Sequence, residues 1–193
     1  MRGIIFRTYL NFMKDNFGYG TLDGILLRDD YPNKGGFSSA GNYPSLYLLS
    51  LVENSKYLFG NSTDKVLQAF GKYSFGFLLD RFKKSYAGTA TPLHTKNAYD
   101  FLEKLNIIHF DELKKIYHDA VFPKFDIERA GNEHIIIEYS SHRNLPYFVY
   151  GLIDGCLKYF NENATLTIEK TNRHKIVKNV KARIYRFEVK GNG

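Results

Sequence analysis

Tyr139, Ser141 and Arg143 occupy alternate positions in the stretch "EYSSHR". Side chains at i, i+2 and i+4 of an extended segment lie on one side of it, so a phenol, a hydroxyl and a guanidinium could converge on one object. Arginine grips a carboxylate or phosphate with two parallel N–H bonds, and each hydroxyl could add one more. The spacing therefore indicates an anion-binding group. The structural alternative is that the serine caps a helix, the tyrosine belongs to a strand and the arginine is a solvated residue at a helix start.

One histidine of the six, His109, falls on an apolar face. Leu105, His109 and Leu113 follow one another at i, i+4 spacing in a predicted helix, whereas the other five histidines lie in loops, near turns or in a basic segment. A buried imidazole often bonds a buried carbonyl or carboxylate, but neutral imidazole is also the usual axial ligand of haem iron. A structural zinc site fits less well, because the chain has a single cysteine, Cys156, on a predicted apolar helix.

A non-covalent haem would account for both features. Its macrocycle is apolar and its two propionates are carboxylates, so its pocket needs an inward axial ligand and a cationic, donor-rich rim. His109 could supply the ligand, and Tyr139, Ser141 and Arg143 the rim. Covalent c-type attachment is excluded because the sequence has no C-x-x-C-H motif.

The elements that must position these residues are helices first and a sheet last. Apolar spacing predicts a helix that contains Ile5 and ends at "NFGYG", a second in "PSLYLLSLVENSKYL", a third that starts at Ser62 or Thr63, and a fourth over residues 98–117. After Pro123 the apolar period changes to two.

Four strands are predicted in the second half, at "KFDIERA", "HIIIEYS", "ATLTIEK" and "KARIYRFEVK". The segment "NLPYFVYGLIDGCLKYFNE" reads as a helix between the second strand and the third. The connections "AGNE" and "TNRHKIVKN" have hairpin length, so the sheet should be antiparallel. We expect an α+β fold with a helical N-terminal lobe, a C-terminal lobe of helices and a four-stranded antiparallel sheet, and the haem buried between them.

Length and composition predict one domain over residues 1–193, divided into a helical lobe of about 1–65 and a lobe of about 66–193 that holds the haem-ligating helix and the sheet. The most apolar runs are far shorter than the roughly 18 residues of a membrane span. The first residues mix Arg7, Lys14 and Asp15 into their apolar positions, unlike a signal peptide, so we expect a cytoplasmic location.

A net charge of +7 leaves a nucleic-acid-binding module open as an alternative. Much of the excess lies in "EKTNRHKIVKNVKARIYRFEVK", where such a module would bind phosphates with help from Tyr139 and Arg143. The same segment alternates as a hairpin does, so its lysines and arginines could equally form a solvated sheet face.

The sequence resembles the haem-nitric oxide/oxygen binding (H-NOX) family, in its bacterial stand-alone form, over essentially the whole chain. The resemblance is carried by "MRGIIF", "AFGKYSFGF", "IIHFDELKKIYHDAVFPKF", and "YSSHR" followed by "GLIDG". It implies that haem b (Fe-protoporphyrin IX) is held by His109 as proximal iron ligand and by Tyr139, Ser141 and Arg143 at the propionates. It also implies that Pro123 presses on the macrocycle; alone, Pro123 would read as an ordinary loop proline.

The same resemblance places residues on the distal side of the haem: Ile5, Tyr9, Ser74, Phe75, Leu78, Phe148 and Leu152. Oxygen-binding members of the family carry a tyrosine where this chain has Phe148, which cannot donate a hydrogen bond to dioxygen. Nitric oxide needs no such donor, so an NO sensor is expected. The alternative is an oxygen sensor in which Tyr9 or Ser74 is the donor, although Tyr9 could also be only part of a buried helical stripe.

The function that the resemblance implies is gas sensing and signal transduction, not catalysis. NO, or carbon monoxide, would bind the iron, and NO would release His109 and change the conformation. Since the sequence ends at "VKGNG", we expect the signal to pass to a separate protein such as a histidine kinase or a cyclic-di-nucleotide enzyme. A haem enzyme such as a peroxidase is a further alternative, but it usually needs a distal acid–base group that this pocket lacks.

Overall fold

A computed structural model of the chain describes residues 1–86, 95–107 and 122–193. Its helices are α1 (Gly3–Leu26), α2 (Ser45–Ser55), α3 (Thr63–Tyr86), α4 (Ala98–Glu103) and α6 (Pro146–Tyr159), with 3-10 turns η1 (Pro32–Gly35) and η2 (Lys56–Phe59). The strands are β1 (Lys124–Gly131), β2 (His134–Ser140), β3 (Ala164–Val177) and β4 (Val180–Gly191). They form one antiparallel sheet in the order β1-β2-β4-β3, which confirms the predicted α+β fold.

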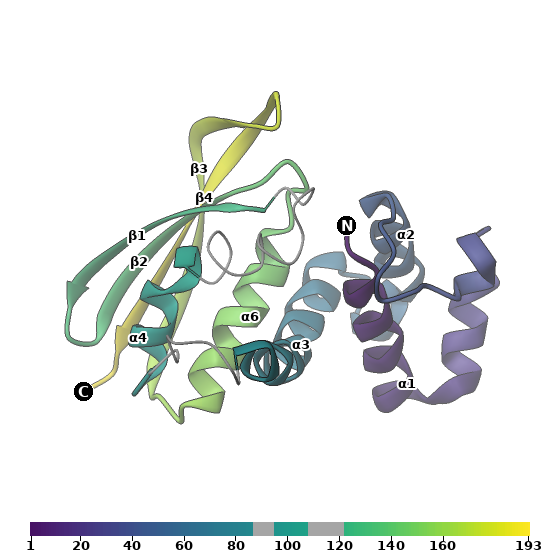
Figure 1. Cartoon of the computed structure of the whole chain (residues 1–193), viewed down its shortest axis with the longest axis horizontal. Helices are drawn as coiled ribbons and strands as arrows, with labels where there is room; N and C mark the ends of the chain where they lie inside the picture. Colours follow the sequence, from purple (N-terminus) through teal and green to yellow (C-terminus); the bar gives the residue numbers. More distant parts are fainter. Residues whose placement is uncertain (87–94, 108–121) are drawn as a thin grey trace.

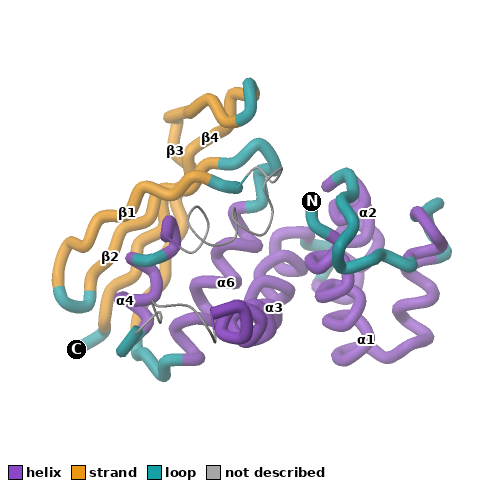
Figure 2. Tube along the Cα trace, viewed as in Figure 1, coloured by secondary structure: helices purple, strands orange, loops and turns teal. Residues whose placement is uncertain are grey.

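The sheet lies at one end of the molecule and α1 and α2 lie at the other (Figure 1). Helices α3 and α6 run between them and join the two ends, while α4 lies beside the sheet (Figure 2). The protein therefore has a sheet-containing part and a helical part, and helices α3 and α6 connect them.

Two helix ends follow the local sequence closely. Helix α1 breaks at Gly18, where φ is +81°, inside the stretch predicted to end it, but the chain resumes a helix up to Leu26 that the sequence analysis missed. Helix α3 begins after Ser62, whose hydroxyl accepts a hydrogen bond from the Lys65 backbone N–H at 3.3 Å.

The helix predicted over residues 98–117 is interrupted. Helix α4 ends at Glu103, and Lys104 turns the chain before a further helical stretch reaches Ile107. His109 and Leu113 lie outside the described residues, so the apolar face on which His109 was placed stays a prediction.

The β3–β4 hairpin is longer than predicted. The segment expected to be its connection continues both strands, and Val177 pairs with Val180 across a two-residue turn. Lys178 and Asn179 form this turn with positive φ values of 53° and 59°, the geometry whose twist matches that of paired strands. A register shift between Lys170 and His174 bends the hairpin, whose end projects past β1 and β2 (Figure 1).

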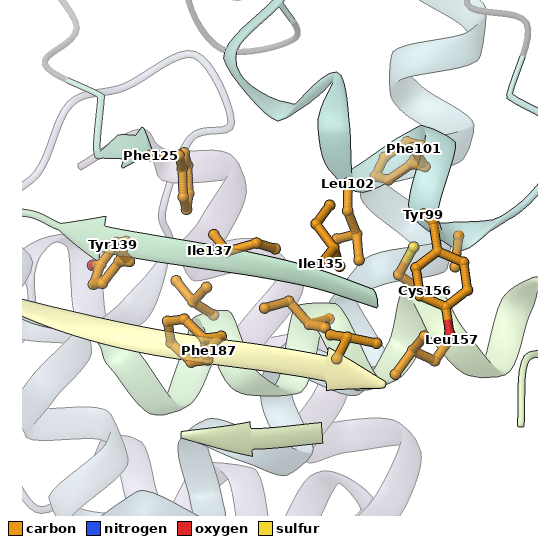
Figure 3. Packing of buried hydrophobic residues seen from close by; sticks show 14 of the residues in the cluster. Tyr99, Phe101, Leu102, Phe125, Ile135, Ile137, Tyr139, Cys156, Leu157 and Phe187 are labelled. Carbon is orange, nitrogen blue, oxygen red and sulfur yellow. The ribbon is translucent and has the colours of Figure 1, made fainter. Parts of the chain in front are cut away.

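Two groups of buried side chains hold the fold together. The sheet core packs one face of the sheet against α6, α4 and the second half of α3, and it includes Phe75 and Ile153. Figure 3 shows other members of this core, among them Tyr139 and Phe187. The helical core joins α1, α2 and the first half of α3; it includes Phe6, Tyr9, Leu51, Phe70 and Leu145. Helix α3 contributes to both cores, and the predicted division into lobes near residue 65 stays a prediction.

Helices α3 and α6 cross at two glycines. A Cβ atom on Gly71 would lie 2.2 Å from the Phe148 carbonyl oxygen, and one on Gly151 would lie 2.1 Å from the Gln68 carbonyl oxygen. Only glycine permits this approach of the two backbones.

Among the helices that the structure describes, none has both the length and the apolar character of a membrane-spanning segment.

Candidate functional site

The predicted anion-binding residues lie where the two cores meet. Tyr139, near the end of β2, is buried in the sheet core with its ring 5.7 Å from that of Phe125 and 6.4 Å from that of Phe187 (Figure 3). Its phenol oxygen accepts a hydrogen bond from the backbone N–H of Leu145, a helical-core residue, at 3.3 Å. Tyr139 thus holds the first turn of α6 while its own O–H remains able to donate.

Ser141 is the second residue of the triplet and shapes the loop of residues 141–145, here called the motif loop. Its hydroxyl accepts the backbone N–H of Arg143 at 3.2 Å, and its carbonyl accepts that of Asn144, which has a φ of +50°. The chain therefore turns after Ser141, so the extended spacing predicted for all three residues holds only as far as Ser141. The structure brings the Tyr139 and Ser141 hydroxyls together, and the half-buried Arg143 follows inside the turn.

The electrostatics of the motif loop favour an anion. Burial raises the pKa of Tyr139, opposed by the hydrogen bonds from Ser141 and Leu145 and by the positive charge of Arg143. Burial lowers the pKa of Arg143, an effect that the Tyr139 phenol opposes. A guanidinium that has lost part of its hydration is stabilised by a negative charge beside it.

Further positive charges gather at the same place. Burial lowers the pKa of His142, and Arg143, Lys178 and the α-amino group of Met1 lower it further. The pKa of that α-amino group is itself lowered by burial and then by Arg143, Lys178 and Arg2, while the group donates to the Tyr43 carbonyl at 2.6 Å. Like charges held this close are stabilised by an anion that all of them can face.

The chain that leads toward His109 is attached to the sheet. Asn106 donates from its side-chain nitrogen to the Phe125 carbonyl at 3.0 Å, and its buried side-chain oxygen has no hydrogen-bond partner in the parts of the chain that are described. Pro123, half-buried, immediately precedes β1 and lies two residues before Phe125. The assignments of His109 as ligand and of Pro123 as a contact of the macrocycle remain predictions.

Three aromatic rings connect the predicted distal residues of the helical core. The Tyr9 ring lies 4.9 Å from that of Phe70, edge to face, and the Phe70 ring lies 4.9 Å from that of Phe148. Ile5 packs, half-buried, against the same core. The sequence analysis missed Phe70 as a member of this wall, although it lies within the quoted stretch "AFGKYSFGF".

The two candidate distal hydroxyls are both bonded to the protein. The Tyr9 phenol donates to the Leu51 carbonyl at 3.1 Å or to the Ser55 hydroxyl at 2.5 Å, and burial raises its pKa. Ser74 donates to the carbonyl of Phe70, one turn earlier in α3, at 2.7 Å. Both hydroxyls are fully buried.

Two of the remaining predicted distal residues, Phe75 and Leu152, belong to the sheet core or pack against it. Phe75 is buried there with its ring 5.4 Å from that of Phe101, and Leu152 packs half-buried against the same core. Leu78 is half-buried on α3. The predicted distal set is therefore divided between the two cores, with α3 and α6 carrying residues of both groups.

A cavity of about 410 Å³ lies apart from these residues, between α3, α6 and β3. Its lining includes Lys72, Tyr150, Asp154 and Leu166, and Lys72 pairs with Asp154 at 2.7 Å. None of the residues predicted to bind haem lines it.

The residues present suit a haem. The Tyr139 phenol and the partly buried guanidinium of Arg143 in the motif loop can donate to carboxylates, and His142 adds a buried Nδ1 that has no partner in the described residues. The aromatic and aliphatic side chains of α1, α3 and α6 match an apolar macrocycle. The sequence analysis had dismissed His142 as a turn residue, although its place inside "YSSHR" was a usable signal.

Comparison with known proteins agrees with this chemistry. The family model described as Haem-NO-binding (HNOB) matches residues 2–168, and the chain belongs to this family of haem-based gas sensors. No curated protein matches the chain.

Solved structures of H-NOX proteins share the whole fold. The Fe(II) unliganded H-NOX protein from K. algicida is 26% identical, with a TM-score of 0.81 over 100% of this chain and 97% of that one. An S. oneidensis H-NOX protein in the Fe(II)NO ligation state is 20% identical, with a TM-score of 0.80 over 100% of both chains. The I5F mutant of T. tengcongensis H-NOX is 18% identical, with a TM-score of 0.78 over 100% and 98%. The last two establish the likeness of fold alone.

Proposed function

We propose that this chain binds haem b non-covalently through His109 and senses nitric oxide. Tyr139, Ser141 and Arg143 would hold the propionates. Support comes from the Tyr139 phenol, which accepts hydrogen bonds from the Leu145 backbone N–H and from Ser141 and so keeps its own proton for an outside acceptor. The half-buried guanidinium of Arg143 beside it adds the charge that a carboxylate requires.

Bound haem, held by His109, would supply an iron atom that can take a diatomic gas. The chain's own residues would decide which gas is retained. A distal hydrogen-bond donor stabilises oxygen much more than it stabilises nitric oxide or carbon monoxide, which bind without one.

The single observation that carries the choice of nitric oxide is the bonding of the distal hydroxyls. Tyr9 and Ser74, the two donors left open by the sequence, each bond an acceptor within the protein. Phe148 presents only carbon atoms, packed on Phe70. A donor to bound oxygen would have to break one of these buried hydrogen bonds, at a cost of about 1 to 3 kcal/mol.

Signalling would pass through the segment that carries His109, the proposed iron ligand. Asn106 lies three residues before His109 and is hydrogen-bonded to Phe125 on β1. A shift of the segment that carries His109 would therefore also move β1 and the neighbouring Pro123. The two states, with His109 bound and released, would present different surfaces to a separate partner, which we propose is a histidine kinase or a cyclic-di-nucleotide enzyme.

A catalytic role is not favoured. The distal side chains named above are aromatic, aliphatic or hydroxyl-bearing, and none of these titrates near neutral pH, as a peroxidase-type acid–base group would need to do. The nucleic-acid alternative is also weakened, because Arg173 and Lys175 of the basic segment form ion pairs with Glu138 and Asp126.

Absorption spectroscopy of the purified protein tests the proposal. Haem-reconstituted protein should show a Soret band that is lost in His109→Gly and regained with imidazole, while the matched variant His174→Gly, altered at an exposed strand residue, should keep it. A wild type that takes up no haem would refute the proposal. Reduced protein should form NO and CO complexes but no stable oxygen complex, and a stable oxygen spectrum would refute NO selectivity.

A further inference from the structure

His142 lies beside the three residues predicted to hold the haem carboxylates, yet the motif assigns it no role. Its Nδ1 atom is buried and has no hydrogen-bond partner within residues 1–86, 95–107 and 122–193. A buried imidazole nitrogen usually has a partner, because desolvating it without one costs free energy. A ligand group at this point would supply the missing hydrogen-bond partner.

The charges around His142 are positive. Arg143 adjoins it in the motif loop, Lys178 comes from the β3–β4 turn and the α-amino group of Met1 from the start of the chain; all three disfavour the protonated imidazole, and Arg2 acts on the α-amino group in turn. Positive charges from three different segments thus act on one another, and a second anionic contact beside that of Arg143 would be favourable.

The position of Lys178 is set by the bent hairpin. Its turn residues follow Val177, which is 2% exposed, and the buried Thr171 hydroxyl donates to the Ile184 carbonyl at 2.8 Å below the bend. The ion pairs of Arg173 with Glu138 and of Lys175 with Asp126 tie the same hairpin to β2 and β1. The charge of Lys178, which acts on His142, is therefore carried by an anchored element.

We propose that His142 and Lys178 form a second carboxylate-binding pair beside Tyr139, Ser141 and Arg143, and that they contact a haem propionate. This inference rests on the proposed haem function. It adds a titratable donor to the binding of the cofactor, so haem retention depends on pH near neutrality through a residue other than the iron ligand.

The sign of the pH dependence follows from linkage. Without an anion, burial and neighbouring positive charge keep the pKa of His142 below its ordinary value of 6.5. A carboxylate at Nδ1 favours the imidazolium and raises the pKa of His142, so haem binding takes up a proton. The added affinity is complete when the pH lies below the pKa of haem-free His142, and it is lost as the pH rises through the higher pKa of the haem-bound state.

The pH dependence of haem retention is measured as the rate of haem loss to excess apomyoglobin at about pH 6 and about pH 8. The wild type should lose haem more slowly at the lower pH than His142→Gln by roughly three- to tenfold, and the two should converge at the higher pH. Lys178→Gln should speed haem loss at both values. The controls His174→Gln and Lys181→Gln, at exposed positions of the same hairpin, should match the wild type.

An esterified haem tests whether His142 acts on the propionate carboxylates themselves or only through long-range charge. With haem dimethyl ester, which has no free carboxylates, the difference between wild type and His142→Gln should vanish. Thermal unfolding of the haem-free variants, followed by circular dichroism, checks that each one folds.

The inference is overturned if the rate of haem loss changes between the two pH values by the same factor in His142→Gln as in the wild type. It is also overturned if the two proteins still lose haem dimethyl ester at different rates. Either result leaves the proposed function intact, since the wild type would still bind haem through His109. A wild type that binds no haem refutes the proposed function itself.

Discussion

The phenol oxygen of Tyr9 lies 2.5 Å from the hydroxyl oxygen of Ser55, in the buried contact between α1 and the end of α2. Ser55 in turn reaches the Val52 carbonyl at 3.0 Å, and Tyr9 the Leu51 carbonyl at 3.1 Å. The Tyr9 hydroxyl therefore joins two helices of the helical core, and this bonding bears directly on whether it can serve a gas ligand.

Tyr9→Phe should lower the free energy of unfolding by about 1 to 2 kcal/mol, because Ser55 loses a buried partner. The oxygen response of the reduced haem protein should not change. Urea unfolding followed by circular dichroism measures the first quantity and absorption spectra the second. Tyr19→Phe, on an exposed residue of the same helix, should have no measurable effect on stability. A wild type that forms an oxygen complex, together with a Tyr9→Phe variant that does not, would show that the hydroxyl acts as a distal donor.

Phe148→Tyr should turn the reduced protein toward oxygen binding. The change adds a phenol to a half-buried ring that packs on Phe70, and our proposal puts that ring over the distal face. The measurement is the absorption spectrum of the reduced variant in air, where we expect a stable oxygen complex. Phe17→Tyr adds the same group at a half-buried ring that packs on Phe59 and should leave the gas response unchanged. An unaltered spectrum in Phe148→Tyr would argue against a distal position for this residue.

Gly151→Ala should destabilise the protein by about 2 kcal/mol or more, since the new Cβ would meet the Gln68 carbonyl oxygen of α3 at 2.1 Å. Gly24→Ala is the matched control. Gly24 lies in α1 with no atom within 4 Å of an added Cβ, so alanine there should be neutral or stabilising by up to about 1 kcal/mol. Urea unfolding compares the two variants. Equal stabilities would mean that α3 and α6 do not cross as closely as described.

Tyr73 should titrate well above an ordinary tyrosine. Burial raises its pKa to about 12, together with the hydrogen bond of 2.6 Å that it donates to Asp15 and the charge of that carboxylate. The stabilisation that this bond contributes is present below pH 10 and is lost as the pH rises toward 12. NMR titration of ¹³Cζ-labelled tyrosine, assigned with Tyr73→Phe, gives the pKa.

Asp15→Asn should lower the pKa of Tyr73 while leaving it above 10, because burial remains. Asp23→Asn, on an exposed residue of the same helix, should leave it unchanged. A Tyr73 that titrates near 10 in the wild type would contradict the contact between α1 and α3.

Local sequence pattern predicted most of the elements of this fold. The change of apolar period after Pro123 predicted four strands, and Ser62 marked the start of α3, because each signal depends on residues that are neighbours along the chain. The break at Lys104 and the extension of β3 through residues 171–177 were missed, since a continuous apolar helix pattern and a basic stretch respectively masked them.

For the candidate site too, some features were predictable from the sequence and others depended on residues far apart in the chain. The order of its motifs identified the family, and the types of Tyr139, Ser141 and Arg143 predicted an anion. The direction of the Tyr9 hydroxyl depends on Ser55, 46 positions away, and the surroundings of His142 depend on Lys178 at the tip of a distant hairpin. The sequence by itself therefore determined the family, the fold class and the chemical types at the site. Only the tertiary structure decided which hydroxyls are already bonded and which charges face one another, because hydrogen bonds and Coulomb interactions act over a few ångströms of space and not along the chain.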